Sequence, residues 1–323
     1  MKFRNTLHVL IDNFSLTYKQ LLYKLVVTLI FIGITTAIMM PTLNLITGSE
    51  HFSNLWTGVK ELLRNLVQGR TEEVASATEL IENSFKELLD LVARKRARIA
   101  WSVLGIVIAY LVQKFFIGLG NFAMSAVIND KMAMRADSPF MVTLIRNLKV
   151  ATLYNLIYVP LSFVYDALIV FIAYLFIFKL FSLLPLIFLP LKLLLFVSII
   201  TLLLAVKMTF TTDWLPALIR GKMSQKEAFI YTFKRKNKST FTVLSHFVVF
   251  ALSIFAVNVI AVIGTFGAAL FLTIPASYIL LGAFELVNYY DREELPYSVD
   301  KNTIIKPEKE HTPTIEEFFK GQD

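Results

Sequence analysis

The chain has 323 residues, of which 56% are hydrophobic and only 17% are charged, and its formal net charge is +8. Average soluble domains are about 45–50% apolar and about 25% charged, so the composition argues against a water-soluble globular protein. Cysteine is absent, which excludes disulfides, thiolate metal sites, iron–sulfur clusters and cysteine nucleophiles.

The first twenty residues are predicted to form an amphipathic helix. Apolar residues recur at helical spacing and face a polar side: Phe3, Leu7, Leu10, Ile11, Phe14 and Tyr18 lie opposite Asn5, Asp12, Asn13 and Ser15. Such a stripe is typical of a helix that lies in the membrane interface. The apolar run that follows has no small-residue cleavage site, so we predict an uncleaved anchor.

Residues 21–288 are predicted to form a polytopic, all-α membrane domain. A helix needs about 20 apolar residues to cross about 30 Å of hydrocarbon, and no Asp, Glu, Lys or Arg lies between Lys238 and Glu285. That interval is long enough to cross twice. We predict six transmembrane helices, at 22–41, 100–127, 151–177, 184–207, 241–262 and 266–288.

Between the first two spans, about residues 48–98, the sequence predicts two amphipathic helices. The apolar stripes are Leu55, Trp56, Val59, Leu62, Leu63 and Leu66, and then Ile81, Phe85, Leu88 and Val92. A Glu82–Lys86 pair at i, i+4 supports the second helix. This insertion either contacts a partner membrane protein, or packs on the membrane surface or on itself.

Basic residues orient the predicted spans. With the N-terminus in the cytoplasm, most Lys and Arg fall in cytoplasmic segments, as the positive-inside rule requires. Arg94, Lys95, Arg96 and Arg98 argue against this orientation, because they then lie on the outer side. The polar residues 289–323 are predicted to be a flexible cytoplasmic tail. The chain is accordingly expected in the cell membrane, with both termini inside.

A basic lead-in precedes the fifth span. Ser224 and Glu227 fit a capping box that begins a short helix, and a basic cluster follows it: Lys234, Arg235, Lys236 and Lys238. Basic residues near an anionic inner leaflet each contribute roughly 1 kcal/mol. We therefore predict that this cluster contacts inner-leaflet lipid. The net positive charge is attributed to such cytoplasmic segments and not to nucleic-acid binding.

The same region carries a resemblance. Asp213 to Phe229 includes Pro216-Ala217-Leu218 and Ser224-Gln225-Lys226-Glu227-Ala228 and leads to the basic cluster. This arrangement resembles that of poorly characterised, Firmicute-type bacterial multi-span proteins, which are similar to the membrane domain attached to some glycerophosphodiester phosphodiesterases. The resemblance implies a bacterial membrane protein. It does not imply the phosphodiesterase activity, because the His-Arg pair of that catalytic domain has no counterpart: none of the four His is followed by Arg.

Motifs for several chemistries are missing from the sequence. There is no phosphate-binding glycine loop of the Walker or Rossmann type and no G-x-S-x-G elbow. His8, His51, His246 and His311 are far apart and do not fit a zinc motif. We therefore expect no cofactor, no metal and no enzymatic activity.

Among the ionisable residues within predicted spans, three stand out: Lys114 in the second, Asp166 in the third and Lys192 in the fourth. Such residues are costly in the membrane and mark a functional site by default. If the third and fourth spans turn near 179–182, Asp166 and Lys192 lie at comparable depth and could line a polar path for an ion or a headgroup. Alternatively the pair is structural, or Lys192 extends outward to the interface and Asp166 pairs with Lys114.

Two functions remain open at this stage. The first, which the basic lead-ins and the amphipathic insertion favour, is a non-enzymatic scaffold or accessory component of the cell envelope. The second is a transporter or channel that uses Asp166 and Lys192.

Overall fold

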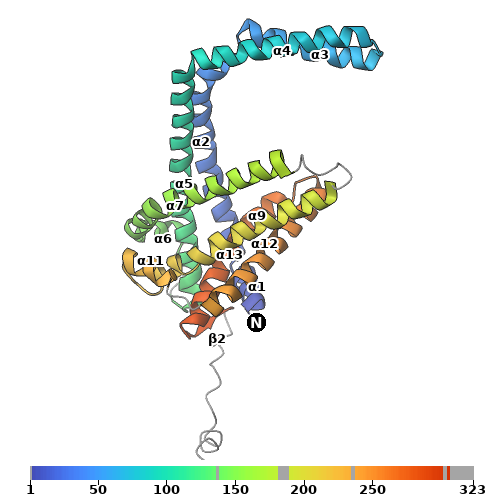
Figure 1. Cartoon of the computed structure of the whole chain (residues 1–323). Helices are drawn as coiled ribbons and strands as arrows, with labels where there is room; N and C mark the ends of the chain where they lie inside the picture. Colours follow the sequence, from blue (N-terminus) through green and yellow to red (C-terminus); the bar gives the residue numbers. More distant parts are fainter. Residues whose placement is uncertain (1, 136–137, 181–188, 234–236, 301–303, 306–323) are drawn as a thin grey trace, which may run out of the picture. The chain divides into compact units, whose positions relative to one another are not determined.

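The computed structural model describes residues 2–135, 138–180, 189–233, 237–300 and 304–305, and nearly all of these are helical (Figure 1). Within them, the only strands are β1 (Tyr297–Ser298) and β2 (Ile304–Ile305), which pair antiparallel. The predicted all-α class is therefore confirmed.

Six helices of the described part are long and apolar enough to cross a membrane, as predicted. They are α2 (Ser15–Thr47), α5 (Arg96–Met132), α7 (Leu148–Leu175), α9 (Leu189–Thr211), α12 (Asn237–Thr265) and α13 (Leu270–Arg292). Helices α2 and α5 have 33 and 37 residues, about 50 and 55 Å at 1.5 Å per residue. They exceed the predicted spans because polar residues at their ends continue the helix beyond the apolar run. Residues 184–188 of the fourth predicted span lie outside the described residues.

The chain divides into two compact units. Unit 1 comprises Met1–Leu25 and Phe115–Asp323, and unit 2 comprises Val26–Lys114. In unit 1, α9 packs against α12 and α7, and α13 packs against α12. Four short helices connect the spans of this unit: α6 (Phe140–Arg146), η1 (Phe176–Leu180), α10 (Trp214–Ile219) and α11 (Gln225–Phe233).

The N-terminal helix α1 (Lys2–Asp12) forms as predicted but ends earlier, and α2 already begins at Ser15. Its packing differs in part from the predicted one. Asn5 and Thr6 are buried, because α1 packs on α13, whereas Leu7 and Ile11 are 42% and 70% exposed. Phe3 and Leu10 of the apolar stripe also pack on protein, so contact with lipid stays a prediction for Leu7 and Ile11 alone.

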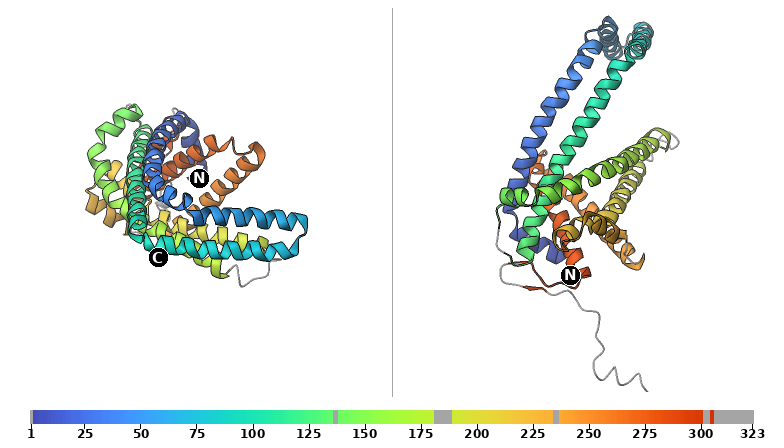
Figure 2. Two further views of the ribbon diagram at one scale, coloured as in Figure 1. Left: turned by 90° about the horizontal axis from the view of Figure 1, so that it is seen from above. Right: turned by 90° about the vertical axis from the view of Figure 1, so that its left-hand side faces the viewer.

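Unit 2 contains the predicted amphipathic insertion as two helices, α3 (Glu50–Gln68) and α4 (Thr71–Arg94). Ser49 caps α3, since its hydroxyl accepts a hydrogen bond from the Phe52 amide at 3.2 Å. Gly69 ends the helix in the left-handed conformation, with φ of 70°, which glycine adopts without strain. The two helices lie side by side and run across the ends of α2 and α5 (Figures 1 and 2).

The predicted capping box begins α11. The Glu227 amide donates to the Ser224 hydroxyl at 3.3 Å, and the Ser224 amide donates to the Glu227 carboxylate at 3.0 Å. These bonds hold the pKa of Glu227 below its usual range. Of the predicted lipid-contact cluster, Lys234, Arg235 and Lys236 lie outside the described residues, and the side chain of Lys238 is not described either.

The predicted tail 289–323 begins later than expected. Helix α13 continues to Arg292, and Tyr297 and Val299 are buried, at 2% and 5% exposure. Tyr297 is held by hydrogen bonds from Asn5 and to Asp291. The first part of this segment is therefore packed on the helices, while residues 306–323 lie outside the described part.

Alanine at Gly120 is expected to destabilise the fold. A Cβ at this position of α5 would lie 2.5 Å from the Tyr23 ring, whose hydroxyl is fixed to the Phe116 carbonyl at 2.8 Å. Overpacking of this kind costs about 1–3 kcal/mol. Gly120→Ala should lower the melting temperature in detergent. Gly33→Ala, with nothing within 4 Å of its Cβ, should not lower it; equal effects of the two would contradict the packing.

The cap of α11 should depend on pH. Because the pKa of Glu227 is lowered in the fold, its contribution is present above the unfolded pKa and is lost as pH falls through the folded pKa. Acidification should therefore speed hydrogen exchange at the first turn of α11, after correction for intrinsic rates. Glu227→Gln, which keeps an amide for the box, should remove this pH dependence.

Candidate functional site

Asp166 of α7 forms an ion pair with Lys207 of α9. The Lys207 ammonium lies 2.5 Å from the carboxylate and also donates to the Ser162 hydroxyl at 2.7 Å. Ser162 in turn donates to Asp166 at 3.4 Å. The two charged side chains are 26% and 16% exposed. Asp166 is thus paired between α7 and α9, and its cation is a residue that the sequence analysis did not select.

The predicted partner, Lys192, lies elsewhere on α9. It precedes Lys207 along the same helix by about 22 Å at 1.5 Å per residue, and it is 4% exposed. The prediction placed the turn between these spans near 179–182. Instead η1 continues to Leu180 and α9 begins only at Leu189, which shifts the register. The expectation that Asp166 and Lys192 lie at comparable depth is therefore wrong.

Lys114, the third predicted residue, belongs to unit 2. Its ammonium lies 5.0 Å from the centroid of the Tyr110 ring, one turn earlier on α5. A cation over an aromatic face is a stabilising arrangement, so this contact explains how the lysine is accommodated on an apolar helix.

A cavity of about 370 Å³ opens beside the Asp166–Lys207 pair, between α7, α9 and α11. Its volume falls within the roughly 300–1,000 Å³ of small-molecule sites. Most of the wall is apolar or aromatic, and Ser162, Lys207 and Thr211 provide hydrogen-bonding groups. The lining is Tyr158, Leu161, Ser162, Val164, Tyr165, Leu168, Lys207, Phe210, Thr211, Trp214, Phe229 and Phe233.

Trp214 is the centre of the aromatic wall. Its ring centroid lies 4.9 Å from that of Phe229, 5.1 Å from that of Tyr154 and 6.1 Å from that of Tyr158. Its indole is 1% exposed, and its N–H has no hydrogen-bond partner within the part of the chain that the structure describes. A buried indole N–H normally finds an acceptor, so this donor is an unsatisfied polar group behind the cavity wall.

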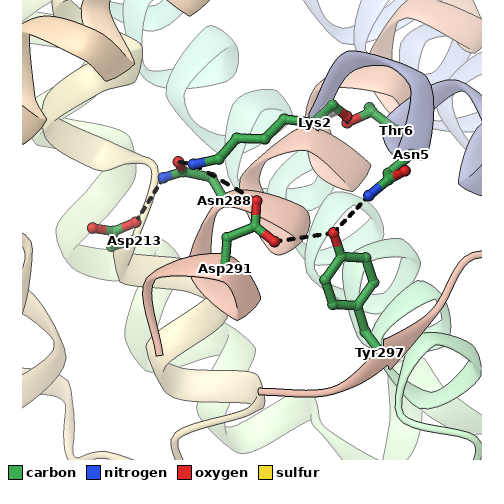
Figure 3. Close-up of polar contacts among 7 residues, drawn as sticks. All are labelled: Lys2, Asn5, Thr6, Asp213, Asn288, Asp291 and Tyr297. Atoms are coloured by element: carbon green, nitrogen blue, oxygen red, sulfur yellow. Dashed lines mark hydrogen bonds and ion pairs between the residues drawn. The ribbon is translucent and has the colours of Figure 1, made fainter. Parts of the chain in front are cut away.

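The residue before Trp214 belongs to a buried polar network. Asp213 has no exposed surface, and its carboxylate accepts hydrogen bonds from Arg292 and from Asn288 of α13. Figure 3 shows how Asn288 continues the chain of contacts, because its amide oxygen accepts a bond from Lys2 of α1 at 3.2 Å. The corner between α9 and α10 is thereby tied to α13 and α1.

The network then reaches the C-terminal strand. Lys2 lies 3.7 Å from the Asp291 carboxylate, which accepts a bond from the Tyr297 hydroxyl at 3.0 Å. Asn5 donates to the same hydroxyl at 2.9 Å (Figure 3). Burial raises the pKa of Tyr297, so its phenol stays protonated at neutral pH and keeps donating to Asp291.

A second tyrosine borders the network on α11. The Tyr231 hydroxyl donates to the Glu293 carboxylate, and the Arg292 guanidinium lies 4.2 Å from the Tyr231 ring centroid. Burial, followed by the bond to Glu293, raises the pKa of Tyr231. Like Tyr297, it therefore remains a neutral donor at neutral pH.

The sequence analysis missed Lys207, Asp213 and Arg292. Lys207 stood at the end of the fourth predicted span, while Asp213 and Arg292 lay just outside predicted spans. An ionisable residue at the edge of an apolar run is normally expected at the membrane interface. Asp213 is instead fully buried, where Arg292 and Asn288 of α13 bind its carboxylate. Glu285 fell inside the sixth predicted span and is half-buried in α13, so its position alone was a signal. Across the described residues, no group of three His, Asp or Glu could hold a metal ion.

Loss of Asp213 is expected to be strongly destabilising. Asp213→Ala leaves Arg292, 22% exposed, without its carboxylate, and removing one partner of a buried pair costs about 3–5 kcal/mol. Unfolding in mixed micelles should show the loss. Glu82→Ala removes a surface pair with Lys86 whose members are both 65% exposed, and should leave the unfolding midpoint unchanged. A small effect of Asp213→Ala would contradict the role given to the network.

Comparison with known proteins adds no relative. No protein-family model matches the chain, no curated protein matches it, and no solved structure matches it. The resemblance of residues 213–229 to the membrane domain of glycerophosphodiester phosphodiesterases therefore stays a prediction. The comparisons therefore assign no family and no fold relative to this chain.

Proposed function

We propose that the chain is a non-enzymatic accessory protein of the cell membrane that holds a membrane-resident amphiphile between α7, α9 and α11. The observation that carries this proposal is the cavity, which combines an aromatic wall with the Lys207–Asp166 pair. An apolar chain would fill the aromatic part. The head group would lie at Lys207.

The charge balance of the site favours an uncharged head group. An ammonium has three donors, and two of those of Lys207 go to Asp166 and Ser162. The third can reach a ligand oxygen, but Asp166 already neutralises the lysine charge. A full anion would therefore gain little, whereas the oxygen of an ester, amide or hydroxyl would accept a bond from Lys207. The amphiphile class that fits is a lipid of the diacylglycerol type.

Transport is the weaker alternative. It requires Asp166 and Lys192 to line one polar path, but Asp166 bonds to Lys207 and Ser162, and Lys192 lies about 22 Å away along α9. An ion-paired carboxylate would also have to give up Lys207 before it could bind a cation. The accessory function needs no such rearrangement.

The proposed location is the bacterial cell membrane, with both termini in the cytoplasm. Hydrogen bonding between Asn5 and Tyr297 supports two ends on one side, which six spans also require. The distribution of basic residues supports the cytoplasmic side, and the resemblance noted in residues 213–229 supports a bacterial source.

The fluorescence of Trp214 can report whether the cavity is occupied. Trp56 and Trp101 are 52% and 73% exposed, whereas Trp214 is 1% exposed, so Trp56→Phe and Trp101→Phe leave one buried reporter. In nanodiscs, brominated diacylglycerol should quench this tryptophan saturably, and brominated phosphatidylcholine should quench it far less. Lys207→Met should weaken quenching by brominated diacylglycerol roughly tenfold or more, since a hydrogen bond to a charged group contributes about 1.5–3 kcal/mol.

Three controls separate binding from misfolding. Lys226→Met removes an exposed lysine of α11 outside the cavity and should change nothing. Asp166→Asn combined with Lys207→Met leaves no unpaired charge and should still lose affinity. Val164→Phe, at a lining residue that is 67% exposed, should block entry. Equal quenching in all variants would contradict the proposal. If the protein instead conducts ions into liposomes and Asp166→Asn abolishes this flux, transport is supported in its place.

A further inference from the structure

The α3–α4 hairpin of unit 2 is held rigidly at the ends of two spans. Only Gly48 and Ser49 separate α2 from α3, and only Lys95 separates α4 from α5. The apolar run of α2 continues to Ile46, and that of α5 begins at Ile99. Because the hairpin runs across these helix ends (Figures 1 and 2), it lies at the boundary of the hydrocarbon layer and extends along it.

Small residues form the contact between the two helices. Gly58 packs so closely on α4 that a Cβ would lie 2.9 Å from a side-chain carbon of Ile81. Ala77 and Ser84 are each 2% exposed on the α4 side. Six large apolar side chains of the hairpin are left more than half exposed: Trp56, Leu63, Leu66, Val67, Phe85 and Leu89.

These exposed side chains share one face of the hairpin. Leu66 follows Gly58 by eight residues and Phe85 follows Ala77 by eight, so each is turned about 80° from the contact line at 100° per residue. In two antiparallel helices the same rotation from the contact line leads to the same face. Arg64, Thr57 and Glu61 are turned from the contact line by about 240°, 260° and 300°, so they belong to the opposite, polar face of α3.

A basic cluster stands where the hairpin joins α5. Arg94, Lys95, Arg96 and Arg98 are all exposed, and no acidic residue lies among them. Anionic lipid headgroups attract such clusters when they flank a span. Trp56 adds a second feature of membrane interfaces, where tryptophan is enriched. Charge, aromatic content and position therefore indicate the same partner.

We propose that the α3–α4 hairpin binds the surface of an anionic bilayer. Its apolar face enters the boundary between headgroups and acyl chains, its polar face stays in water, and the basic cluster contacts lipid phosphates. The hairpin is thus a second lipid-binding surface of the chain, independent of the amphiphile cavity.

The absence of cysteine makes single spin labels straightforward. Full-length Leu63→Cys and Glu61→Cys, labelled in nanodiscs with phosphatidylglycerol, report the two faces of α3, since the two positions are about 160° apart around the helix. The Leu63 label should collide with oxygen, which concentrates in lipid, and the Glu61 label with a water-soluble nickel complex. Two water-accessible labels would overturn the proposal. A Leu63 label shielded from both reagents would overturn it in favour of a protein partner or a second copy.

The charge contribution has its own test. Replacing Arg94, Lys95, Arg96 and Arg98 by Gln should reduce oxygen collisions at the Leu63 label severalfold in anionic nanodiscs, to the value found in phosphatidylcholine alone. The control variant Arg64→Gln removes a charge of the polar face and should leave the collisions unchanged. If both sets behave alike, the basic cluster does not bind anionic lipid and that half of the proposal is wrong.

Discussion

Asp213 is a carboxylate with no exposed surface, at the corner between α9 and α10. An unpaired charge there would cost several kcal/mol, so the fold depends on the donors that Arg292 and Asn288 of α13 supply. The pairing fixes the corner between α9 and α10 against the last span. Since Trp214 follows directly, the same contact positions the indole that forms the centre of the cavity wall. Through Asn288 it also reaches Lys2.

In unit 1 many polar side chains are buried and many apolar side chains are exposed, a pattern that suits a membrane protein better than a water-soluble one. Asn5, Thr6, Gln20, Asn129 and Asp213 are all under 4% exposed, whereas leucine and isoleucine cover the outside. Acyl chains solvate apolar side chains as well as a protein interior does, so helices gain little by burying them and associate through packing and hydrogen bonds. Gln20 to Asn121 at 2.9 Å, and Tyr290 to Asn129 at 2.9 Å, are contacts of this kind.

This burial of polar side chains and exposure of apolar ones explains which features could be predicted from the sequence and which could not. Long charge-free runs predict spans because hydrocarbon excludes charge, and all six are present. Capping residues act locally, so the box at Ser224 and Glu227 was equally predictable. Hydrophobic periodicity, however, marks the apolar face without saying whether lipid or protein covers it. In α1 the rule assigned Asn5 to the wrong side, since its partner Tyr297 lies almost three hundred residues away in the chain.

The predicted pairing of Asp166 with Lys192 was wrong for a related reason. Depth along a helical hairpin is set by the position of its turn, and the segment between Leu180 and Leu189 contains one proline, Pro185, and no charge from which to place the turn. In the structure Lys207, fifteen residues after Lys192 in the sequence, lies opposite Asp166. The presence of a charge in a span was predictable, whereas its partner depended on register.

The cavity in unit 1 and the α3–α4 hairpin of unit 2 both depend on helix contacts made by small or polar residues. In the hairpin, Gly58, Ala77 and Ser84 make the helix contact, which leaves Trp56 and Phe85 free for a lipid surface. In unit 1, hydrogen bonds tie α13 to α1 and α10, and the aromatic side chains around Trp214 are left to line a space instead of filling it. Contacts built from small and polar residues thus release large apolar groups for lipid. Because the two surfaces belong to different units and share no residue, substitutions in one are expected to act additively with those in the other, which allows each lipid contact to be removed by itself.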